Sequence, residues 1–248
     1  MRATIKQYYE NTDAIKCKAK ILKIHESSIE LDRTIAYPEG GGQEGDHGRI
    51  RLCTDPNLVI AFNDTQISMA TPVFIDDFPG VKTGGIILHH ISDKERLNDF
   101  QTGDEVWIEI DQQRRKSMSL NHTAAHIVYW AVDMRRPGVV EHTIGCHIKT
   151  DSARLDFATE NRFSQEDIKA IEELSNQLIK AGHPVIMRSR QEYYDVRYWE
   201  CNGYVIPCGG THAKNTNELS ALKLQRKNIG KNKERLIFSL QSPTEVEQ

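Results

Sequence analysis

The sequence predicts an α+β protein in two parts: a small antiparallel β-barrel, then an α+β domain with helices packed on an antiparallel sheet. Residues 1 to about 110 alternate apolar and polar positions between many glycines and prolines, which is typical of short strands. From residue 119, apolar residues recur at helical spacing, and the order becomes helix, strands, helix, strands. The polar, basic stretch QQRRK at 112–116 separates the two patterns. We therefore expect one domain at 1–112 and another at 113–248.

The first half supplies the strands of the expected barrel. The segments AIKCKAKILKI (14–24) and SSIELDRTIAYP (27–38) alternate as half-buried strands do. GDEVWIEID (103–111) has the pattern of a last strand, and clusters of glycine and proline mark turns between the segments. A small antiparallel barrel or a sandwich fits this pattern, and we predict the barrel.

The second half begins with a helix predicted at 119–134, where Leu120, Ala124 and Ile127 share one face. The segment GCHIKTDSARLDF (145–157) predicts a hairpin that closes on an alternating strand. Ser164 and Asp167 have the spacing of a capping box and predict the start of a second helix, which Gly182 and Pro184 end. Short strands are expected at HPVIMRS (183–189), LSALKLQ (219–225) and RLIFSL (235–240).

Composition and charge exclude several classes of protein. The 248 residues are 38% hydrophobic and 27% charged, near the globular average. No apolar run approaches the roughly 18 residues of a membrane span, and the first residues have no apolar signal core. We therefore expect a cytoplasmic protein without a membrane partner. The formal charge of -3 excludes a uniformly basic coat for nucleic acid, so any basic patch must be local.

Two pairs of side chains have the spacing of metal ligands. His122 and His126 (HTAAH) lie four residues apart on the predicted helix, so their imidazoles share one face. Cys208 and His212 (CGGTH) add a thiolate and a third imidazole, separated by glycines that let the backbone turn tightly. One cysteine and three histidines are a borderline-soft tetrahedral set that suits Zn2+. The zinc can be structural or catalytic, and each pair alone can also be an ordinary core or surface pair.

Two other motifs are absent. Positions 123–125 are Thr, Ala and Ala, so the HExxH pattern of zinc proteases fails. The run Gly40–Gly41–Gly42 lacks the following Lys-Ser/Thr of a phosphate-binding loop. Two interpretations of the three glycines remain. They form either a tight turn or a loop whose backbone N-H groups approach the 3′ end of an RNA.

Four segments resemble the editing domain of alanyl-tRNA synthetase and the segment that precedes it. They are PEGGGQEGDHG (38–48), NHTAAH (121–126), SARLDF (152–157) and CGGTHAKNTNEL (208–219). Their order matches, and the resemblance covers nearly the whole chain. At 248 residues we expect no room for aminoacylation domains, so the chain is similar to the free-standing AlaX-type editing proteins that keep the N-terminal barrel.

The resemblance implies an enzyme, an aminoacyl-tRNA deacylase. The substrate that the resemblance implies is tRNA(Ala) mischarged with serine or with glycine, and no DNA partner is expected. By the same resemblance His122, His126, Cys208 and His212 bind zinc. Gln43 of the GGGQ segment faces the editing site, with Gly41 and Gly42 beside the substrate. Thr143 lies 21 residues after the first metal histidine, and a threonine near this position engages the serine hydroxyl.

A strip of basic residues near the end of the chain is expected to contact RNA phosphates. Its members are Lys223, Arg226, Lys227 and Lys231, with Lys233 and Arg235 beside them, and Arg114, Arg115 and Lys116 at the domain junction. A solvated loop around Gly230 is the alternative interpretation.

Two other functions remain open at this point. One is a zinc-stabilised tRNA-binding module without catalysis. The other is a deacylase of a different mischarged tRNA, such as Ser-tRNA(Thr).

Overall fold

A computed structural model describes residues 3–78 and 80–241, and it divides into two compact units. Unit 1 comprises Met1–Gly40, Glu44–Arg115 and Ser189–Arg197, and unit 2 comprises Gly41–Gln43, Lys116–Arg188 and Tyr198–Gln248. Gly41–Gln43, the last three residues of the GGGQ motif, therefore belong to unit 2, whereas the residues on either side of them belong to unit 1. The domain division predicted after residue 112 stays a prediction.

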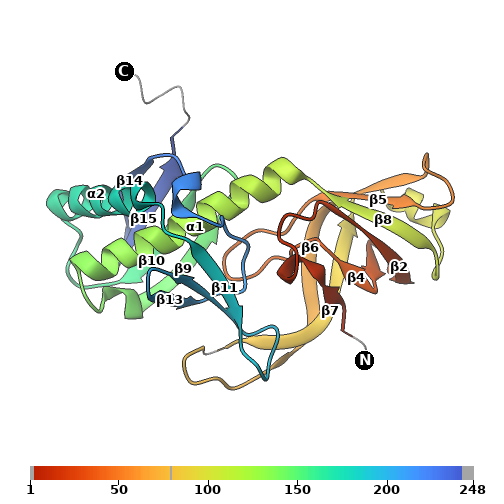
Figure 1. The fold of residues 1–248 in the computed structure, drawn as a ribbon, viewed down its shortest axis with the longest axis horizontal. Helices are drawn as coiled ribbons and strands as arrows, with labels where there is room; N and C mark the ends of the chain where they lie inside the picture. Colours follow the sequence, from red (N-terminus) through yellow and green to blue (C-terminus); the bar gives the residue numbers. More distant parts are fainter. Residues whose placement is uncertain (1–2, 79, 242–248) are drawn as a thin grey trace. The chain divides into compact units, whose positions relative to one another are not determined.

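Unit 1 contains a closed antiparallel barrel, as predicted (Figure 1). The strands follow one another around it in the order β2, β3, β7, β6, β5, β8. Their bounds are Lys16–Ile24 (β2), Ser28–Leu31 (β3), Gly48–Leu52 (β5), Val59–Pro72 (β6), Lys82–Ile91 (β7) and Glu105–Ile110 (β8). A short parallel pair, β1 (Ile5–Lys6) with β4 (Arg33–Thr34), and the 3-10 turns Gln7–Tyr9 and Lys94–Asp99 accompany it. Closure pairs every barrel strand on both sides, which removes exposed edges.

The barrel core is made of the apolar half of each alternating strand. Ile21, Ile29, Leu31, Ile50 and Val106 are fully buried in one cluster. Because successive side chains of a strand point to opposite faces, neighbours such as Lys20, Arg49 and Glu105 are exposed. The alternation that predicted the strands is therefore the same property that fills the barrel.

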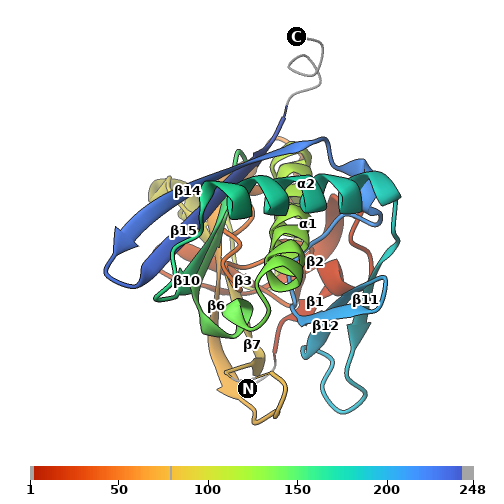
Figure 2. The same ribbon diagram turned by 90° about the vertical axis from the view of Figure 1, so that its left-hand side faces the viewer.

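Unit 2 packs two helices on the antiparallel sheet β14-β15-β10-β9 (Figure 2). The helices are α1 (Gln112–Arg135) and α2 (Gln165–Ala181). The strands are β9 (Thr143–Ile148), β10 (Ala153–Ala158), β14 (Leu222–Gly230) and β15 (Lys233–Leu240). Ala124 and Val128 of α1, Ile171 of α2, and Phe157 and Leu236 of the sheet are fully buried in one core. The α+β class is confirmed.

The ends of α2 follow local signals in the sequence. The Ser164 side chain accepts from the backbone of Asp167, whose carboxylate accepts from the Ser164 N-H, so the predicted capping box forms. Gly182 ends the helix with φ 67°, a left-handed conformation that glycine adopts without steric cost. Both boundaries were predicted.

The start of α1 differs from the prediction. The helix begins at Gln112 rather than at residue 119, so the polar stretch 112–116 forms its first turn. The Asp111 carboxylate accepts the backbone N-H of Arg114 at 2.9 Å, which is the bond of an N-cap. Polarity alone suggested a linker, whereas the cap makes this stretch helical.

A further sheet, β11-β12-β13, was only partly expected. β11 (Val185–Ser189) was predicted, but β12 (Arg197–Cys201) and β13 (Tyr204–Pro207) were not. Asn202 and Gly203 connect them with φ 48° and 81°. This Asn-Gly pair is a strong hairpin signal, so the sequence carried the information.

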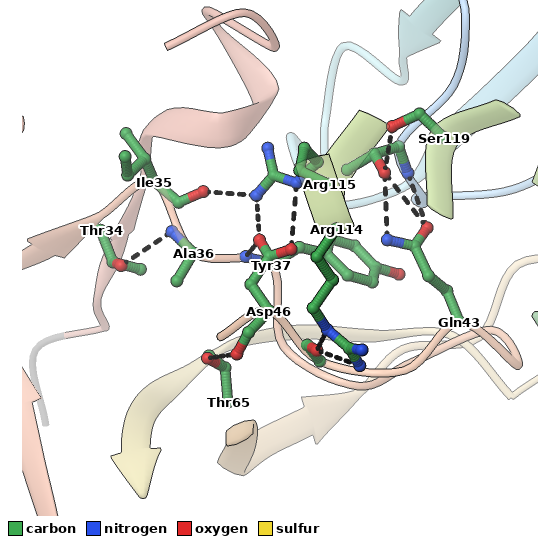
Figure 3. A network of polar contacts seen from close by, with 12 residues as sticks. Thr34, Ile35, Ala36, Tyr37, Gln43, Asp46, Thr65, Arg114, Arg115 and Ser119 are labelled. Atoms are coloured by element: carbon green, nitrogen blue, oxygen red, sulfur yellow. Dashed lines mark hydrogen bonds and ion pairs between the residues drawn. The ribbon is translucent and has the colours of Figure 1, made fainter. Parts of the chain in front are cut away.

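A buried ion pair in unit 1 holds the segment that follows the GGGQ motif (Figure 3). Arg115 contacts both carboxylate oxygens of Asp46, which also accepts the backbone N-H of Tyr37 at 2.7 Å. Arg115 donates a further bond to the Ile35 carbonyl at 2.7 Å. Arg114 donates to Glu44 at 2.9 Å. Since Arg115 is buried, it is not available to RNA, contrary to the expectation for the junction.

No helix in the part of the chain that the structure describes is long and apolar enough to cross a membrane.

Replacing Asp46 by Asn is expected to lower the free energy of unfolding by about 3 kcal/mol, because it leaves the Arg115 charge buried without its counter-ion. The matched change is Glu109→Gln, which breaks the exposed pair with Arg49 and is expected to cost less than about 1 kcal/mol. Urea denaturation of both variants measures the difference. Equal losses would contradict the assignment of a structural role to the buried pair.

Candidate metal centre

His122, His126, Cys208 and His212 meet in unit 2, and all four are buried. Each offers one ligand atom, and these atoms lie within 4.8 Å of one another. His122 and His126 come from α1, and Cys208 and His212 come from the loop that follows β13. The cluster can hold a metal ion, so the grouping expected from the two spaced pairs exists in the fold.

The glycines of the CGGTH loop allow this close approach. A Cβ atom at Gly210 would lie 2.2 Å from Cε1 and 2.4 Å from Nδ1 of His122. These distances are too short for a residue with a side chain. The Gly210 N-H in turn donates to the Cys208 sulfur at 3.3 Å. Gly210 is therefore required by the contact between the loop and α1.

The chemistry of the donors fits a metal ion. Cys208 Sγ lies 3.5 Å from His122 Nε2 and 3.4 Å from His212 Nε2. His126 Nδ1 is buried and has no hydrogen-bond partner among the described residues. Three imidazoles and a thiolate are compatible with zinc, since they are ligands that zinc prefers.

Burial keeps the cluster uncharged. It lowers the pKa of His122 to about 3 and the pKa values of His126 and His212 well below the usual range. Burial also raises the pKa of the Cys208 thiol to about 12. The imidazoles thus keep their lone pairs, and a cation between them would favour the thiolate and release its proton.

Polar side chains fix the orientation of two of the histidines. The Gln43 Oε1 lies 2.8 Å from Nδ1 of His122, and Thr123 Oγ1 lies 3.3 Å from Nδ1 of His212. In each ring the other nitrogen, Nε2, then faces Cys208. Bonds of this kind set which nitrogen carries the proton and leave the other for a metal ion.

Gln43 is held in turn by the CGGTH loop (Figure 3). Its side-chain nitrogen donates to the Thr211 hydroxyl at 3.0 Å, and its oxygen accepts the Thr211 backbone N-H at 3.1 Å. The Ser119 hydroxyl on α1 donates to the same Thr211 oxygen at 2.8 Å. Gln43 is fully buried, so this network connects the GGGQ motif with both metal-ligand segments. A catalytic role for Gln43 stays a prediction.

The glycines before Gln43 bring the backbone against β9. Gly41 and Gly42 have φ 59° and 83°, and a Cβ at Gly42 would lie 2.3 Å from the Cys146 sulfur. The Gly42 carbonyl accepts the backbone N-H of Ile148 at 2.7 Å. Gly42 therefore serves close packing that places Gln43, whereas nothing lies within 4 Å of a Cβ at Gly41. Their contact with substrate stays a prediction.

Thr143 lies outside the buried cluster. It is exposed at the start of β9, and its hydroxyl donates to the Val140 carbonyl at 2.7 Å. Its proposed contact with a substrate hydroxyl stays a prediction.

The basic residues predicted to bind RNA differ from one another in their surroundings. Lys223 pairs with Glu172 at 3.0 Å, and Arg226 makes a bidentate pair with Glu234, a buried carboxylate. Lys227 and Lys231 are exposed. The charge of Arg226 is therefore already compensated within the protein.

Three residues of the site were not predicted. Thr211 lies inside the CGGTH motif and Thr123 inside the HTAAH motif. Their place next to the metal-ligand candidates in the sequence could have indicated that they contact the site. Trp199 of β12 packs edge-on against His126, with 4.9 Å between ring centroids, and only the fold brings it there.

The part of the chain that carries Cys208 and His212 also matches known proteins. Residues 196–237 match the family model described as the threonyl and alanyl tRNA synthetase second additional domain. Over 94% of its length the chain is 32% identical to an alanine–tRNA ligase of Methanococcus vannielii, of which it covers 25%. It is 33% identical to an alanine–tRNA ligase of Sulfurisphaera tokodaii over 89% of the chain and 24% of that protein. The chain thus spans about a quarter of these relatives. The resemblance to the alanyl-tRNA editing region is confirmed.

The purified protein is expected to contain about one zinc ion per chain by elemental analysis. The combined substitution Cys208→Ala and His126→Ala removes two donors, so it should abolish zinc binding. A wild-type protein that contains no zinc and takes none up would refute the zinc assignment.

The Gly210→Ala variant provides a sharper test within the same measurement, because it keeps all four ligands and only pushes His122 away. We expect it to lose most of its zinc. Gly40→Ala is the control, since a Cβ there meets no atom closer than 3.5 Å.

Proposed function

Because the chain resembles the editing region of alanyl-tRNA synthetase over almost its whole length, we propose that it hydrolyses the ester of mischarged Ser-tRNA(Ala). It would act in trans as a cytoplasmic, zinc-dependent hydrolase, and Gly-tRNA(Ala) is a second substrate. The observation that carries the proposal is the bond between Gln43 and His122. It joins the GGGQ motif to a residue of the candidate metal centre, 79 positions away in the sequence.

The reaction makes modest chemical demands. An aminoacyl ester is already activated, so water must be oriented and the developing oxyanion stabilised. Zinc held by His122, His126, Cys208 and His212 would supply Lewis acidity or a fixed position for a substrate group. Gln43 would keep the His122 ring in place, and the glycine backbone before it would line the path of the tRNA 3′ end.

Selectivity would come from the serine hydroxyl. We assign its recognition to Thr143, whose hydroxyl donates to the Val140 carbonyl and can accept a hydrogen bond from the serine hydroxyl. When alanine enters such a pocket, the polar group of the protein loses its partner, and this penalty can separate substrates by orders of magnitude. Correctly charged Ala-tRNA(Ala) would then survive.

A zinc-stabilised tRNA-binding module without catalysis is the second candidate. The presence of four buried donors favours it, because a saturated tetrahedral zinc site is typical of structural zinc. A deacylase of another tRNA, such as Ser-tRNA(Thr), is the third, and it is favoured by the description of the matching family model, which names threonyl and alanyl synthetases together.

The three candidates are separated by incubating the purified protein with Ser-tRNA(Ala), Gly-tRNA(Ala), Ala-tRNA(Ala) and Ser-tRNA(Thr). We expect fast release of serine from tRNA(Ala) and no release of alanine above buffer. Binding without turnover would establish the module instead. Faster release of serine from Ser-tRNA(Thr) than from Ser-tRNA(Ala) would establish the third candidate, a deacylase of Ser-tRNA(Thr).

The Thr143→Val variant is expected to lower kcat/KM for Ser-tRNA(Ala) about 10- to 100-fold, because valine has the same shape without the hydroxyl. Zinc content should stay at the wild-type value. The control Thr159→Val removes a threonine hydroxyl that bonds the Asn161 carbonyl. Equal rates in wild type and Thr143→Val would remove Thr143 from the site.

A further inference from the structure

One face of the sheet β14-β15-β10-β9 in unit 2 is basic, although the whole chain has a formal charge of -3. The opposite face carries the core residues, including Leu224, Leu236 and Phe157. The side chains that alternate with these residues point to the basic sheet face. Its charged members are Arg154 and Asp156 of β10, Lys223 and Lys227 of β14, and Lys233 and Arg235 of β15, and Lys223 is already paired with Glu172.

The strand register sets these charges side by side. Lys227 lies directly opposite Arg235, and Arg235 lies opposite Asp156 on the next strand. Lys233 lies opposite Ala158 and Gly230, so it has no acidic neighbour in register. Like charges placed directly opposite each other cost stability. Such an arrangement is expected where an anion binds.

Asp156 orients the two arginines. Arg235 donates to it from Nε at 2.7 Å and from Nη2 at 2.9 Å, and Arg154 contacts it from Nη1. Burial alone would raise the pKa of Asp156, but the hydrogen bonds from Arg235 and Arg154 outweigh it and hold that pKa below its usual value. The carboxylate therefore stays charged, and it serves two guanidinium groups.

Both guanidinium groups keep donors for another ligand. The side chains of Arg154 and Arg235 are 31% and 26% exposed, whereas that of Asp156 is 8% exposed. An arginine side chain carries five N-H donors. Arg235 bonds the Asp156 carboxylate through two of its nitrogens, and Arg154 bonds it through one. Pre-oriented forks of this kind match the geometry of phosphate oxygens.

Within unit 2, the basic sheet face adjoins the candidate metal centre through β9. β9 pairs with β10 on one side, and Gln43 forms a bridge with Ile148, the last residue of β9, on the other. Gln43 contacts His122 of the cluster. Adjacent strands lie about 4.8 Å apart. Because α1 with His122 packs on the opposite face of the sheet, an RNA whose 3′ end reaches the cluster would pass around the sheet edge at β9 and continue across β10 and β15.

We propose that the basic sheet face binds the phosphate backbone of RNA, with Arg154, Arg235, Lys227 and Lys233 as the contacts. The identity of that RNA as tRNA(Ala) rests on the proposed function. An acidic protein segment is the less suitable partner, because the repeated charge of a nucleic-acid backbone matches a row of cations across several strands. The assignment departs from the strip predicted from sequence, since Arg226 is neutralised by Glu234 and Lys223 pairs with Glu172.

The test uses the full-length protein and unacylated tRNA(Ala), with the dissociation constant measured between about 50 and 300 mM KCl. The variant Lys227→Gln with Lys233→Gln removes two exposed charges. We expect binding to weaken on the order of tenfold at 0.1 M salt, and the slope of log K against log salt to fall by about one to two. The matched control, Lys169→Gln with Lys180→Gln on α2, should leave both quantities unchanged.

A second variant, Arg235→Lys, keeps the charge and removes the fork. We expect weaker binding with a nearly unchanged salt slope, since one cation replaces another. Thermal melting of every variant checks that it is folded.

RNA binding is measured without hydrolysis, so failure of the proposed deacylation leaves this test intact. Unchanged affinity and salt slope in the Lys227 and Lys233 variant would overturn the basic sheet face even if wild type releases serine from Ser-tRNA(Ala). Wild-type protein that binds poly-L-glutamate but not tRNA would overturn it as well, in favour of an acidic protein partner.

Discussion

Three imidazoles and a thiol lie buried against one another, and much of unit 2 is arranged around this constraint. Burial disfavours every charged form of these groups, so His122 and its neighbours stay neutral and keep lone pairs available. Such a cluster is stable when the remaining ring nitrogens find partners and when a cation compensates the thiolate. Gln43 and Thr123 supply the partners for two rings. The buried polar side chains are thus the partners that a metal centre at this cluster would require.

The same constraint gives a physical reason for the glycines of both motifs. Gly210 lets the loop approach the His122 ring, and Gly42 lets the Gln43 segment pack against Cys146 of β9. Any side chain at either position would occupy the space of an atom that is already there. The specificity of the two glycine motifs is thus a property of the contacts they permit, and those contacts connect the sheet, α1 and the CGGTH loop into one site.

Local patterns predicted much of the fold. The alternating strands of the barrel, the hairpin β9–β10 and both ends of α2 follow from side-chain periodicity and from capping residues that act within a few positions. The early start of α1 and the hairpin β12–β13 were missed, although Asp111 as a cap and the Asn202–Gly203 turn carried the signals. These misses concern local chemistry that was present in the sequence.

By itself the sequence determined which residues can ligate a metal, because helix geometry fixes the direction of His122 and His126 from their spacing. It also determined the resemblance to the alanyl-tRNA editing region through its motifs. Only the tertiary structure decided what Gln43, Arg226 and Arg235 do. Gln43 reaches His122 across 79 residues, Arg226 is taken up by Glu234, and Arg235 shares Asp156 with an arginine of another strand. Composition shows that a charge exists, but its partner depends on strand register and burial, which are properties of the folded chain.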